Sequence, residues 1–159
     1  YVGSAAMQAL ELKIPPLVVG VVIAACMWFV SWAQPGFAFT FPVQRIVAIS
    51  LGVIGFVIAG SGVVSFARAH TTVNPMKPDA SSALVTSGIY GFTRNPMYLG
   101  LFVALIGWAL FLSNALAFLV LPAFIVYMNR FQIEPEERAL TALFGQEFIA
   151  YSSRVRRWI

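Results

Sequence analysis

The stretch GIYGFTRNPMYLG, residues 88–100, places a cation and several polar groups directly before a long apolar run. Asn95 and Pro96 are typical of a helix start, as the N-cap and the first helical residue. Arg94 is not explained in this way, because the positive end of the helix dipole disfavours a cation. Arg94 therefore needs an anionic partner, which could be lipid phosphate, a carboxylate of the protein or the carboxylate of a ligand.

Three acidic residues follow the last apolar run, in the segment NRFQIEPEERAL. Arg130, Glu134 and Glu137 are four and three residues apart, so they share one helical face if the helix continues through Pro135. If Pro135 breaks the helix, Glu136 and Glu137 fall in the first turn of a new helix, where acids are favoured. Ionisable groups at a membrane boundary are costly, and they therefore indicate a functional site.

The elements that position these groups are membrane helices. The 159 residues are 60% hydrophobic and 10% charged, whereas a soluble domain carries about 25% charged residues. Apolar runs near the ~20 residues of a transmembrane helix predict an integral membrane protein. We expect one all-α domain over residues 1–159, with about four transmembrane helices and a C-terminal amphipathic helix from Pro135. The expected spans are 16–32, 43–67, 96–112 and 116–130.

Several sequence features predict how these helices pack. The second span contains four glycines, which favour close contact with a neighbouring helix. A nucleotide-binding loop is less favoured, because the glycines do not have the spacing of such a loop and no predicted strand precedes them. They are Gly52, Gly55, Gly60 and Gly62. Pro122 predicts a kink in the fourth span. The turn LSNA makes the third and fourth helices antiparallel neighbours. We therefore expect four residues from their polar ends to surround one pocket: Arg94, Tyr98, Glu136 and Glu137.

The basic residues predict the orientation. With four spans, all Lys and Arg residues except Arg45 fall on the side of the two termini. The positive-inside rule places that side in the cytoplasm, and it explains the net charge of +4 better than nucleic-acid binding does. We expect a bacterial or archaeal inner-membrane protein whose active site faces the cytoplasm. Cys26 and His70 are the only residues of their types, so we expect neither a disulfide within the chain nor a metal site. Met7 is the expected native start, and no cleavable signal peptide is expected.

Two blocks of the sequence resemble the isoprenylcysteine carboxyl methyltransferase family and its phospholipid methyltransferase relatives. They are LVTSGIYGFTRNPMYLG and EPEERALTALFGQEFIAYSSRVRRWI. The family pattern is roughly Gly-x-Tyr and Arg-His-Pro-x-Tyr-x-Gly, followed later by Glu-Glu, Phe-Gly-x-Glu-Tyr and a Tyr before a final Val. The matching residues are Gly88, Tyr90, Arg94, Pro96, Tyr98, Gly100, Glu136, Glu137, Phe144, Gly145, Glu147, Tyr151 and Val155. Asn95 replaces the usual histidine and Phe148 the usual tyrosine. The resemblance covers about residues 72–159, and the chain is much shorter than the eukaryotic prenylcysteine enzymes.

The resemblance implies methyl transfer from S-adenosyl-L-methionine, with S-adenosyl-L-homocysteine as the product. The acceptor would be a carboxylate or amine of a lipid-like or amphiphilic molecule in the membrane. Glu136 or Glu137 would accept from the ribose hydroxyls or the amino group of the cofactor, and Tyr90 and Tyr98 would line its pocket or act as interfacial anchors. The implied cofactor-binding residues are Leu84, Val85, Gly88, Tyr90, Arg94, Asn95, Pro96, Tyr98, Glu136 and Glu137.

Three residues are expected to carry the chemistry: Arg94, Arg130 and Glu137. Arg94 would pair with the carboxylate of the cofactor or of an acidic substrate. Arg130 would hold an acceptor carboxylate or serve only as an interfacial anchor. An amine acceptor would need its proton removed, and Glu137 is the best-placed base. We expect the acceptor to enter sideways from the bilayer and the cofactor to arrive through residues 69–93.

Two other classes of protein remain open on sequence grounds. Sterol reductases share a related C-terminal membrane architecture and bind a nicotinamide cofactor, although they have more helices than this chain can form. A membrane scaffold without catalytic activity is the other alternative. Binding of S-adenosylhomocysteine, of a nicotinamide nucleotide or of neither distinguishes the three classes.

Overall fold

The computed structural model describes residues 11–69 and 83–159. The expected start at Met7, His70 and most of the expected cofactor entrance, residues 70–82, lie outside these ranges. Every regular element in the described ranges is helical, which confirms the all-α prediction. The elements are α2 (Pro16–Ala33), η1 (Pro35–Phe37), α3 (Gln44–Arg68), η3 (Gly88–Gly91), α4 (Pro96–Leu112), α5 (Ala115–Phe118), α6 (Leu121–Met128), η4 (Asn129–Ile133), α7 (Glu134–Phe144) and α8 (Gln146–Arg154).

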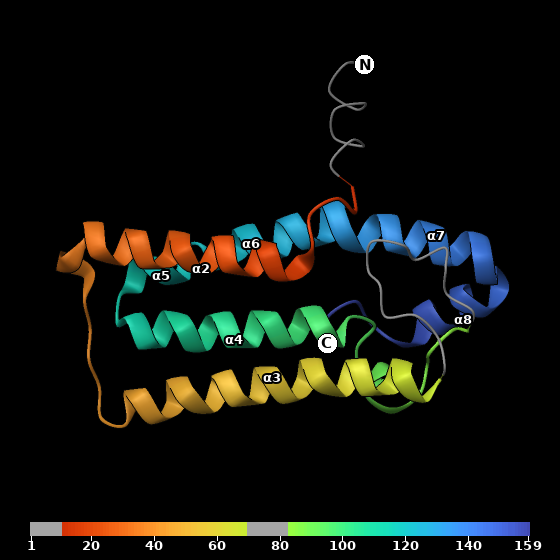
Figure 1. Ribbon diagram of the computed structural model, residues 1–159, viewed down its shortest axis with the longest axis horizontal. Helices are drawn as coiled ribbons and strands as arrows, with labels where there is room; N and C mark the ends of the chain where they lie inside the picture. Colours follow the sequence, from red (N-terminus) through yellow and green to blue (C-terminus); the bar gives the residue numbers. More distant parts are fainter. Residues whose placement is uncertain (1–10, 70–82) are drawn as a thin grey trace, which may run out of the picture.

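The apolar helices lie side by side along the long axis of the molecule (Figure 1). Helix α4 is central, with α3 on one side and α2 and α6 on the other. Within residues 11–69 and 83–159, three helical segments are long and apolar enough to cross a membrane, namely α2, α3 and the run Ala115–Phe144, while α4 is a shorter apolar helix of 17 residues. The expected fourth span, 116–130, is part of a longer helical run that ends at Phe144. The length and composition of the helices are those of an integral membrane protein.

Helices α3 and α4 pack backbone to backbone through glycines spaced by seven residues. A Cβ atom at Gly55 would lie 2.5 Å from the carbonyl oxygen of Gly100 and 2.7 Å from the amide nitrogen of Ala104. A Cβ atom at Gly107 would lie 2.7 Å from the carbonyl oxygen of Ala48. The predicted close packing is therefore correct for Gly55. It also holds for Gly62, whose Cβ atom would lie 3.0 Å from Cγ of Pro96, but not for Gly60, which faces open space. A Cβ atom at Gly52 would meet open space as well, although the amide nitrogen of Gly52 lies 3.0 Å from the Cβ position of Gly107.

Buried amides close the end of the bundle that lies opposite α7 and α8. Gln44 donates from Nε2 to the carbonyl oxygen of Leu110 at 2.7 Å and to Oγ of Ser113 at 2.8 Å. Asn114 donates from Nδ2 to the carbonyl oxygen of Gln34 at 2.8 Å, and its Oδ1 accepts from the amide of Leu116. These bonds hold the predicted tight turn, in which Ser113 has a left-handed backbone, and they make α4 and α5 neighbours.

Pro135 does not break the last long helix, so the first of the two alternatives for the acidic residues is correct. Because proline lacks an N–H, the carbonyl oxygen of Phe131 has no donor four residues along the helix. The amide of Leu12 donates to this oxygen instead, at 3.0 Å. Residues 129–133 form one turn of π-helix directly before Pro135. Earlier in the same helix, Pro122 lies in the first turn of α6, next to the break that separates α5 from α6.

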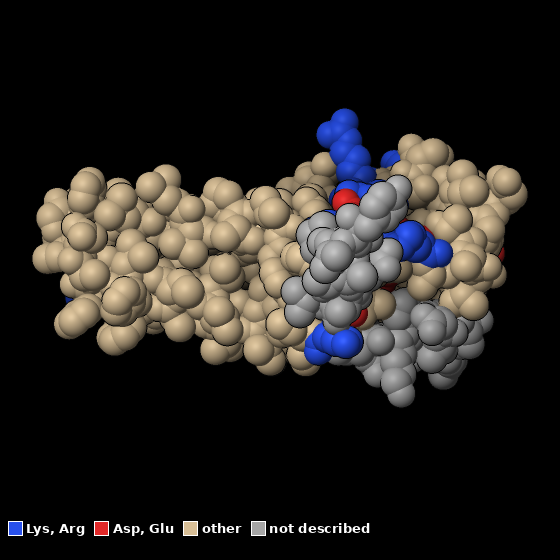
Figure 2. Space-filling view, turned by 90° about the horizontal axis from the view of Figure 1, so that it is seen from above, with Lys and Arg blue, Asp and Glu red and all other residues tan. Residues whose placement is uncertain are grey.

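The amphipathic segment after Pro135 was predicted as one helix and forms two. Gly145 separates α7 from α8, and its φ of +50° belongs to the region that favours glycine. The two helices carry many of the charged groups. Figure 2 shows that the charged residues on this face gather toward the end with α7 and α8, whereas the rest of the face is almost entirely uncharged. Polar chemistry is thus concentrated at one end of an apolar bundle.

Candidate functional site

Residues 155–159 hold the turn that carries Arg94. The amide of Arg94 donates to the carbonyl oxygen of Arg156 at 3.0 Å. The carbonyl oxygen of Arg157 accepts from Thr93 Oγ1 at 3.2 Å and from Asn95 Nδ2 at 2.9 Å. Asn95 stands at the predicted N-cap position of α4, but its side chain makes no capping bond because it is directed to Arg157.

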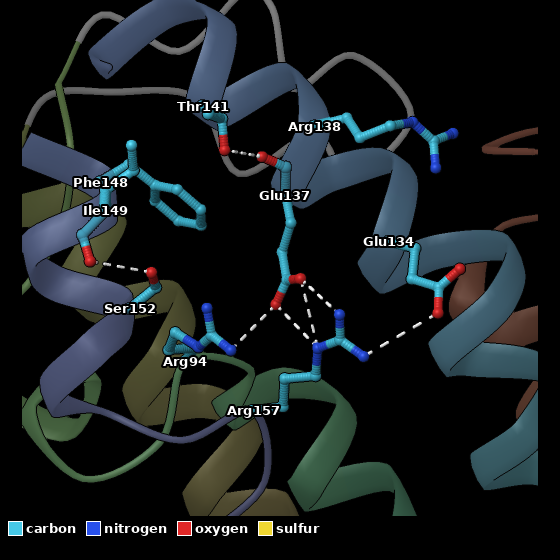
Figure 3. Close-up of a pocket in the computed structure, with 9 residues that line it drawn as sticks. All are labelled: Arg94, Glu134, Glu137, Arg138, Thr141, Phe148, Ile149, Ser152 and Arg157. Carbon is cyan, nitrogen blue, oxygen red and sulfur yellow. Dashed lines mark hydrogen bonds and ion pairs between the residues drawn. The ribbon is translucent and has the colours of Figure 1, made fainter. Parts of the chain in front are cut away.

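The anionic partner of Arg94 is Glu137 of α7. The distance from Arg94 Nη2 to Glu137 Oε1 is 3.1 Å. The same carboxylate accepts from Arg157, at 3.0 Å from Nε to Oε1 and 2.6 Å from Nη2 to Oε2. The carboxylate therefore lies between two guanidinium groups (Figure 3). The side chains of Arg94 and Glu137 are only 14% and 19% exposed, so the pair is strongly shielded from solvent.

A second contact joins α4 to α7 beside this cluster. Tyr98 is buried, and its hydroxyl donates to Glu136 Oε2 at 3.1 Å. Burial inside the protein excludes the alternative that Tyr98 is an interfacial anchor. The structure thus brings Arg94, Tyr98, Glu136 and Glu137 close together, as the hairpin predicted, although only Arg94 and Glu137 line the pocket described next.

An open pocket of about 530 Å³ lies next to Glu137. Its walls come from α7, α8 and two arginines outside those helices (Figure 3). The lining residues are Arg94, Glu134, Glu137, Arg138, Thr141, Phe148, Ile149, Ser152 and Arg157. The side chains of Phe148 and Ile149 give the α8 wall an apolar part, opposite the charged groups. The pocket can therefore hold a ligand that is apolar at one end and zwitterionic at the other.

All six ion pairs among the described residues form one continuous chain of alternating charge, which we call the ion-pair chain. In order, its members are Arg138, Glu11, Arg130, Glu134, Arg157, Glu137 and Arg94. The contacts of Glu11 and Glu137 are within hydrogen-bonding distance, whereas the two contacts of Glu134 measure 3.7 and 3.9 Å. Four cations and three anions give the chain a cation at each end, with Arg94 at the inner end.

The environment of the site fixes the protonation of several groups. The hydrogen bonds from Arg157 to Glu137, with the nearby charge of Glu134, raise the pKa of the Arg157 guanidinium. Burial raises the pKa of Tyr151 to about 12. Its neutral hydroxyl donates to the carbonyl oxygen of Tyr90 at 2.7 Å. Burial also raises the pKa of the Tyr90 phenol. Both phenols are therefore neutral, and the Tyr151 hydroxyl joins α8 to the backbone of η3.

Several residues predicted to bind the cofactor do not line this pocket. Tyr90 packs edge-on against Phe66 of α3, with 5.3 Å between ring centroids. Gly88 has a left-handed backbone beside Ser65, and Val85 is buried. Leu84, Asn95, Pro96, Tyr98 and Glu136 are likewise absent from the lining. Tyr90 and Gly88 pack on α3 instead, because η3 lies against that helix.

Arg130 is also outside the lining of the pocket. Its Nη1 lies 2.8 Å from Glu11 Oε1 and 3.7 Å from Glu134 Oε2. The guanidinium carbon lies 5.7 Å from the centroid of the Phe131 ring. Arg130 reaches the pocket only through Glu134, which contacts Arg157.

Sequence reasoning missed several pocket residues that helical spacing could have identified. Arg138 and Thr141 were missed, although with the predicted Glu134 and Glu137 they follow the i, i+3, i+4, i+7 pattern of one helical face. Phe148 and Ser152 are four residues apart on α8. Arg157 belongs to the basic segment RVRR, but its contact with Glu137 depends on tertiary structure that no local pattern indicates.

Comparison with known proteins identifies the family. The phospholipid methyltransferase family matches residues 43–147. An uncharacterized protein of Haemophilus influenzae is 46% identical over 63 residues, which are 40% of this chain and the whole of that protein. The protein-S-isoprenylcysteine O-methyltransferase of Schizosaccharomyces pombe is 26% identical over 74% of this chain and 50% of its own length.

A probable protein-S-isoprenylcysteine O-methyltransferase of rice is 30% identical over 80% of this chain and 60% of its own length. This chain therefore spans about half the length of the isoprenylcysteine methyltransferases of yeast and rice that it matches. The family match covers α3 to α7 and includes Arg94 and Glu137. On this match, the chain belongs to the phospholipid methyltransferase family.

Proposed function

We propose that this chain transfers a methyl group from S-adenosyl-L-methionine to an amphiphilic acceptor in the membrane. The observation that carries the proposal is Glu137, held between Arg94 and Arg157 beside a pocket at the polar end of the apolar helices. Family membership supports methyl transfer, and the names of the isoprenylcysteine relatives support a lipid-like acceptor. The helices that are long and apolar enough to cross a membrane support an acceptor that arrives from the bilayer.

The charged groups of the pocket suit the amino-acid part of the proposed cofactor. Arg94 Nε is buried and has no hydrogen-bond partner in the described part of the chain. A ligand carboxylate beside Arg94 would satisfy this donor. Glu137 and Glu134 can accept from a ligand ammonium group, while Phe148 and Ile149 offer apolar contact to a purine. A pocket of about 530 Å³ is within the usual range for ligands of this size.

The residues beside the pocket would act by binding and orientation. When bound, S-adenosyl-L-methionine supplies an electrophilic methyl group on its sulfonium. Methyl transfer then depends on in-line placement and exclusion of water more than on a base. The hydrogen bond from Tyr98 to Glu136 joins α4 to α7 beside Arg94. Glu137 is already engaged by two guanidinium groups.

This engagement favours an acceptor that needs no base, namely a carboxylate that is ionised at neutral pH. An amine acceptor remains the second possibility, with Glu137 as its base. We keep the cytoplasm as the proposed side of the pocket and a bacterial or archaeal inner membrane as its location, because the basic residues gather at that end.

Calorimetry with detergent-purified protein tests the proposal. We expect the wild type to bind S-adenosylhomocysteine, and we expect Arg94→Ala to weaken that binding by about tenfold or more, the equivalent of one charge-assisted contact. Arg154→Ala is the matched control, because Arg154 lies on α8 and its Nε donates to the carbonyl oxygen of Ala150 in its own helix. Binding of a nicotinamide nucleotide instead would favour a reductase, and binding of neither ligand would favour a scaffold.

Turnover requires a second assay with a labelled methyl donor. We expect label to pass into amphiphilic acceptors, such as lipid extracts or prenylcysteine analogues, when the wild type is present. Label found only in water-soluble thiols or amines would contradict entry of the acceptor from the bilayer.

A further inference from the structure

The segment before α2 places one carboxylate between two arginines of the last long helix. Glu11 Oε1 lies 2.8 Å from Arg130 Nη1, and Glu11 Oε2 contacts Arg138 Nη2. Each carboxylate oxygen thus has its own guanidinium partner. The Glu11 side chain is 13% exposed, although it belongs to the short segment directly before α2. Arg130 and Arg138 therefore form a cradle for a carboxylate, and Glu11 fills it.

The segment that carries Glu11 is held in a strained conformation. Leu12 has a φ of +56°, which is uncommon for a residue that is not glycine. Its amide bonds the free carbonyl oxygen of Phe131, and Gln132 Nε2 donates to the carbonyl oxygen of Ile14 at 2.6 Å. Such backbone strain persists only where the surrounding contacts impose it. Release of the whole segment, including these two hydrogen bonds, would relieve the strain, which lowers the cost of that release.

The cradle lies where the headgroup of an amphiphile would lie. Arg130 follows directly after the apolar helix α6, whose Val126 is exposed to the surroundings. Arg138 lines the pocket, but Figure 3 shows its guanidinium directed away from Glu137. A ligand whose apolar tail lies along α6 would therefore place its headgroup at the cradle. The cradle is about one or two helical turns from the proposed cofactor pocket.

The charge balance favours an anionic ligand. The ion-pair chain contains one more arginine than glutamate. Replacement of Glu11 by an external oxyanion would keep both arginines paired, and the freed Glu11 would move into solvent. If a neutral headgroup displaced Glu11, Arg130 and Arg138 would lose its carboxylate and gain no other anion, which is unfavourable.

We propose that Glu11 is the internal occupant of an oxyanion-binding cradle, which an acidic amphiphile fills when it displaces Glu11. The oxyanion is a carboxylate or a phosphate. The inference rests on the proposed function only in that the acidic amphiphile would be the methyl acceptor. Its test needs no methyl donor, so failure of the cradle and failure of methyl transfer are separate results.

The test measures equilibrium binding of three amphiphiles with the same acyl chain to the full chain in neutral detergent. Oleate carries a carboxylate, oleoyl lysophosphatidate carries a phosphate, and mono-oleoylglycerol is neutral. We expect Glu11→Gln to bind at least one of the acids about tenfold more tightly than the wild type, because one competing charge-assisted contact is removed. The neutral amphiphile should bind both proteins equally. If the Glu11→Gln variant gains affinity for oleate alone, the result supports a carboxylate occupant. If it gains affinity for the lysophosphatidate, the result supports a phosphate occupant.

Three further variants make the test decisive. Glu147→Gln makes the same chemical change at an exposed residue of α8 outside the ion-pair chain, and it should behave as the wild type. Glu11→Asp is shorter by one methylene and should give a smaller gain, which covers the case in which Glu11→Gln fails to fold. Addition of Arg138→Gln to Glu11→Gln should abolish the gain. Equal binding of the acids to the wild type and to both Glu11 variants, or an equal gain for the neutral amphiphile, would overturn the proposal.

Discussion

Glu134 and Glu137 lie one turn apart on α7 and both line the pocket, but the structure predicts very different consequences of changing them to glutamine. Glu137 is 19% exposed and accepts bonds of 2.6 to 3.2 Å from Arg157, with Arg94 at 3.1 Å. Glu134 is 40% exposed, and its nearest cationic nitrogens lie 3.7 and 3.9 Å away. Those distances exceed a normal hydrogen bond.

The expected losses in the free energy of unfolding follow from this difference. Removing one partner of a buried ion pair costs about 3–5 kcal/mol, because the other charge is left uncompensated. Glutamine at position 137 keeps one oxygen as an acceptor, so we expect a loss of about 3 kcal/mol, at the lower end of that range. An exposed ion pair contributes less than about 1 kcal/mol. The difference of about 2 kcal/mol corresponds to about 4–8 °C in Tm for a chain of this length.

Thermal unfolding of the two variants in the same detergent measures this difference, and S-adenosylhomocysteine calorimetry on the folded proteins adds the functional readout. We expect Glu137→Gln to have the lower Tm and the weaker binding. Equal Tm values for the two variants would refute the idea that Glu137 is the central anion of the site.

Three other predictions test the packing, the orientation and the geometry of Arg157. Gly55→Ala should destabilise the protein by about 1–3 kcal/mol, because its Cβ would meet backbone atoms of α4, whereas Gly52→Ala should be neutral or stabilising, and thermal unfolding compares them. Equal effects would show that α3 and α4 do not pack in this register. Reporter fusions should place residues 34–43 on the outside of the membrane, and a cytoplasmic signal from that loop would reverse the orientation. Arg157→Lys should lower Tm and affinity for S-adenosylhomocysteine, because lysine cannot donate from two nitrogens to Glu137, while Arg156→Lys should change neither. Matching losses in both variants would mean that general charge, and not this geometry, matters.

The sequence predicted the helices well because their ends are marked by local chemistry. Pro16 and Pro96 begin α2 and α4, and Arg68 ends α3. Such residues act on the backbone within one turn, so their effect does not depend on the rest of the fold. The break at Gly145 carries a local signal of the same kind, a glycine with positive φ, which the prediction of one helix overlooked. The continuation through Pro135 could not be read locally, because the amide of Leu12 satisfies the carbonyl oxygen of Phe131 from a distant segment.

The site was predictable only in part for the same physical reason. The hairpin turn at Ser113 and Asn114 makes the ends of α4 and α7 meet, and this brings Arg94 to Glu137. Arg157 and Glu11 reach the same helix from segments whose course follows no periodic pattern. Asn95 shows how far local patterns can predict a single residue. Its N-cap position was predicted, but its side chain donates to the carbonyl oxygen of Arg157 and does not cap the helix. The roles of these residues in binding and catalysis stay predictions.

The ion-pair chain also constrains the order in which the molecule can assemble. Glu11 and Arg130 are 119 residues apart, and Asn95 and Arg157 are 62 residues apart. At a synthesis rate of about 5–20 residues per second, Arg130 emerges on the order of ten seconds after Glu11. The glycine contacts of α3 and α4 can form during that interval, whereas Glu11 must wait in water or at the lipid surface for its arginines. The bundle is thus free to insert before its polar end is complete, and the pocket acquires its shape only after Arg157 has emerged.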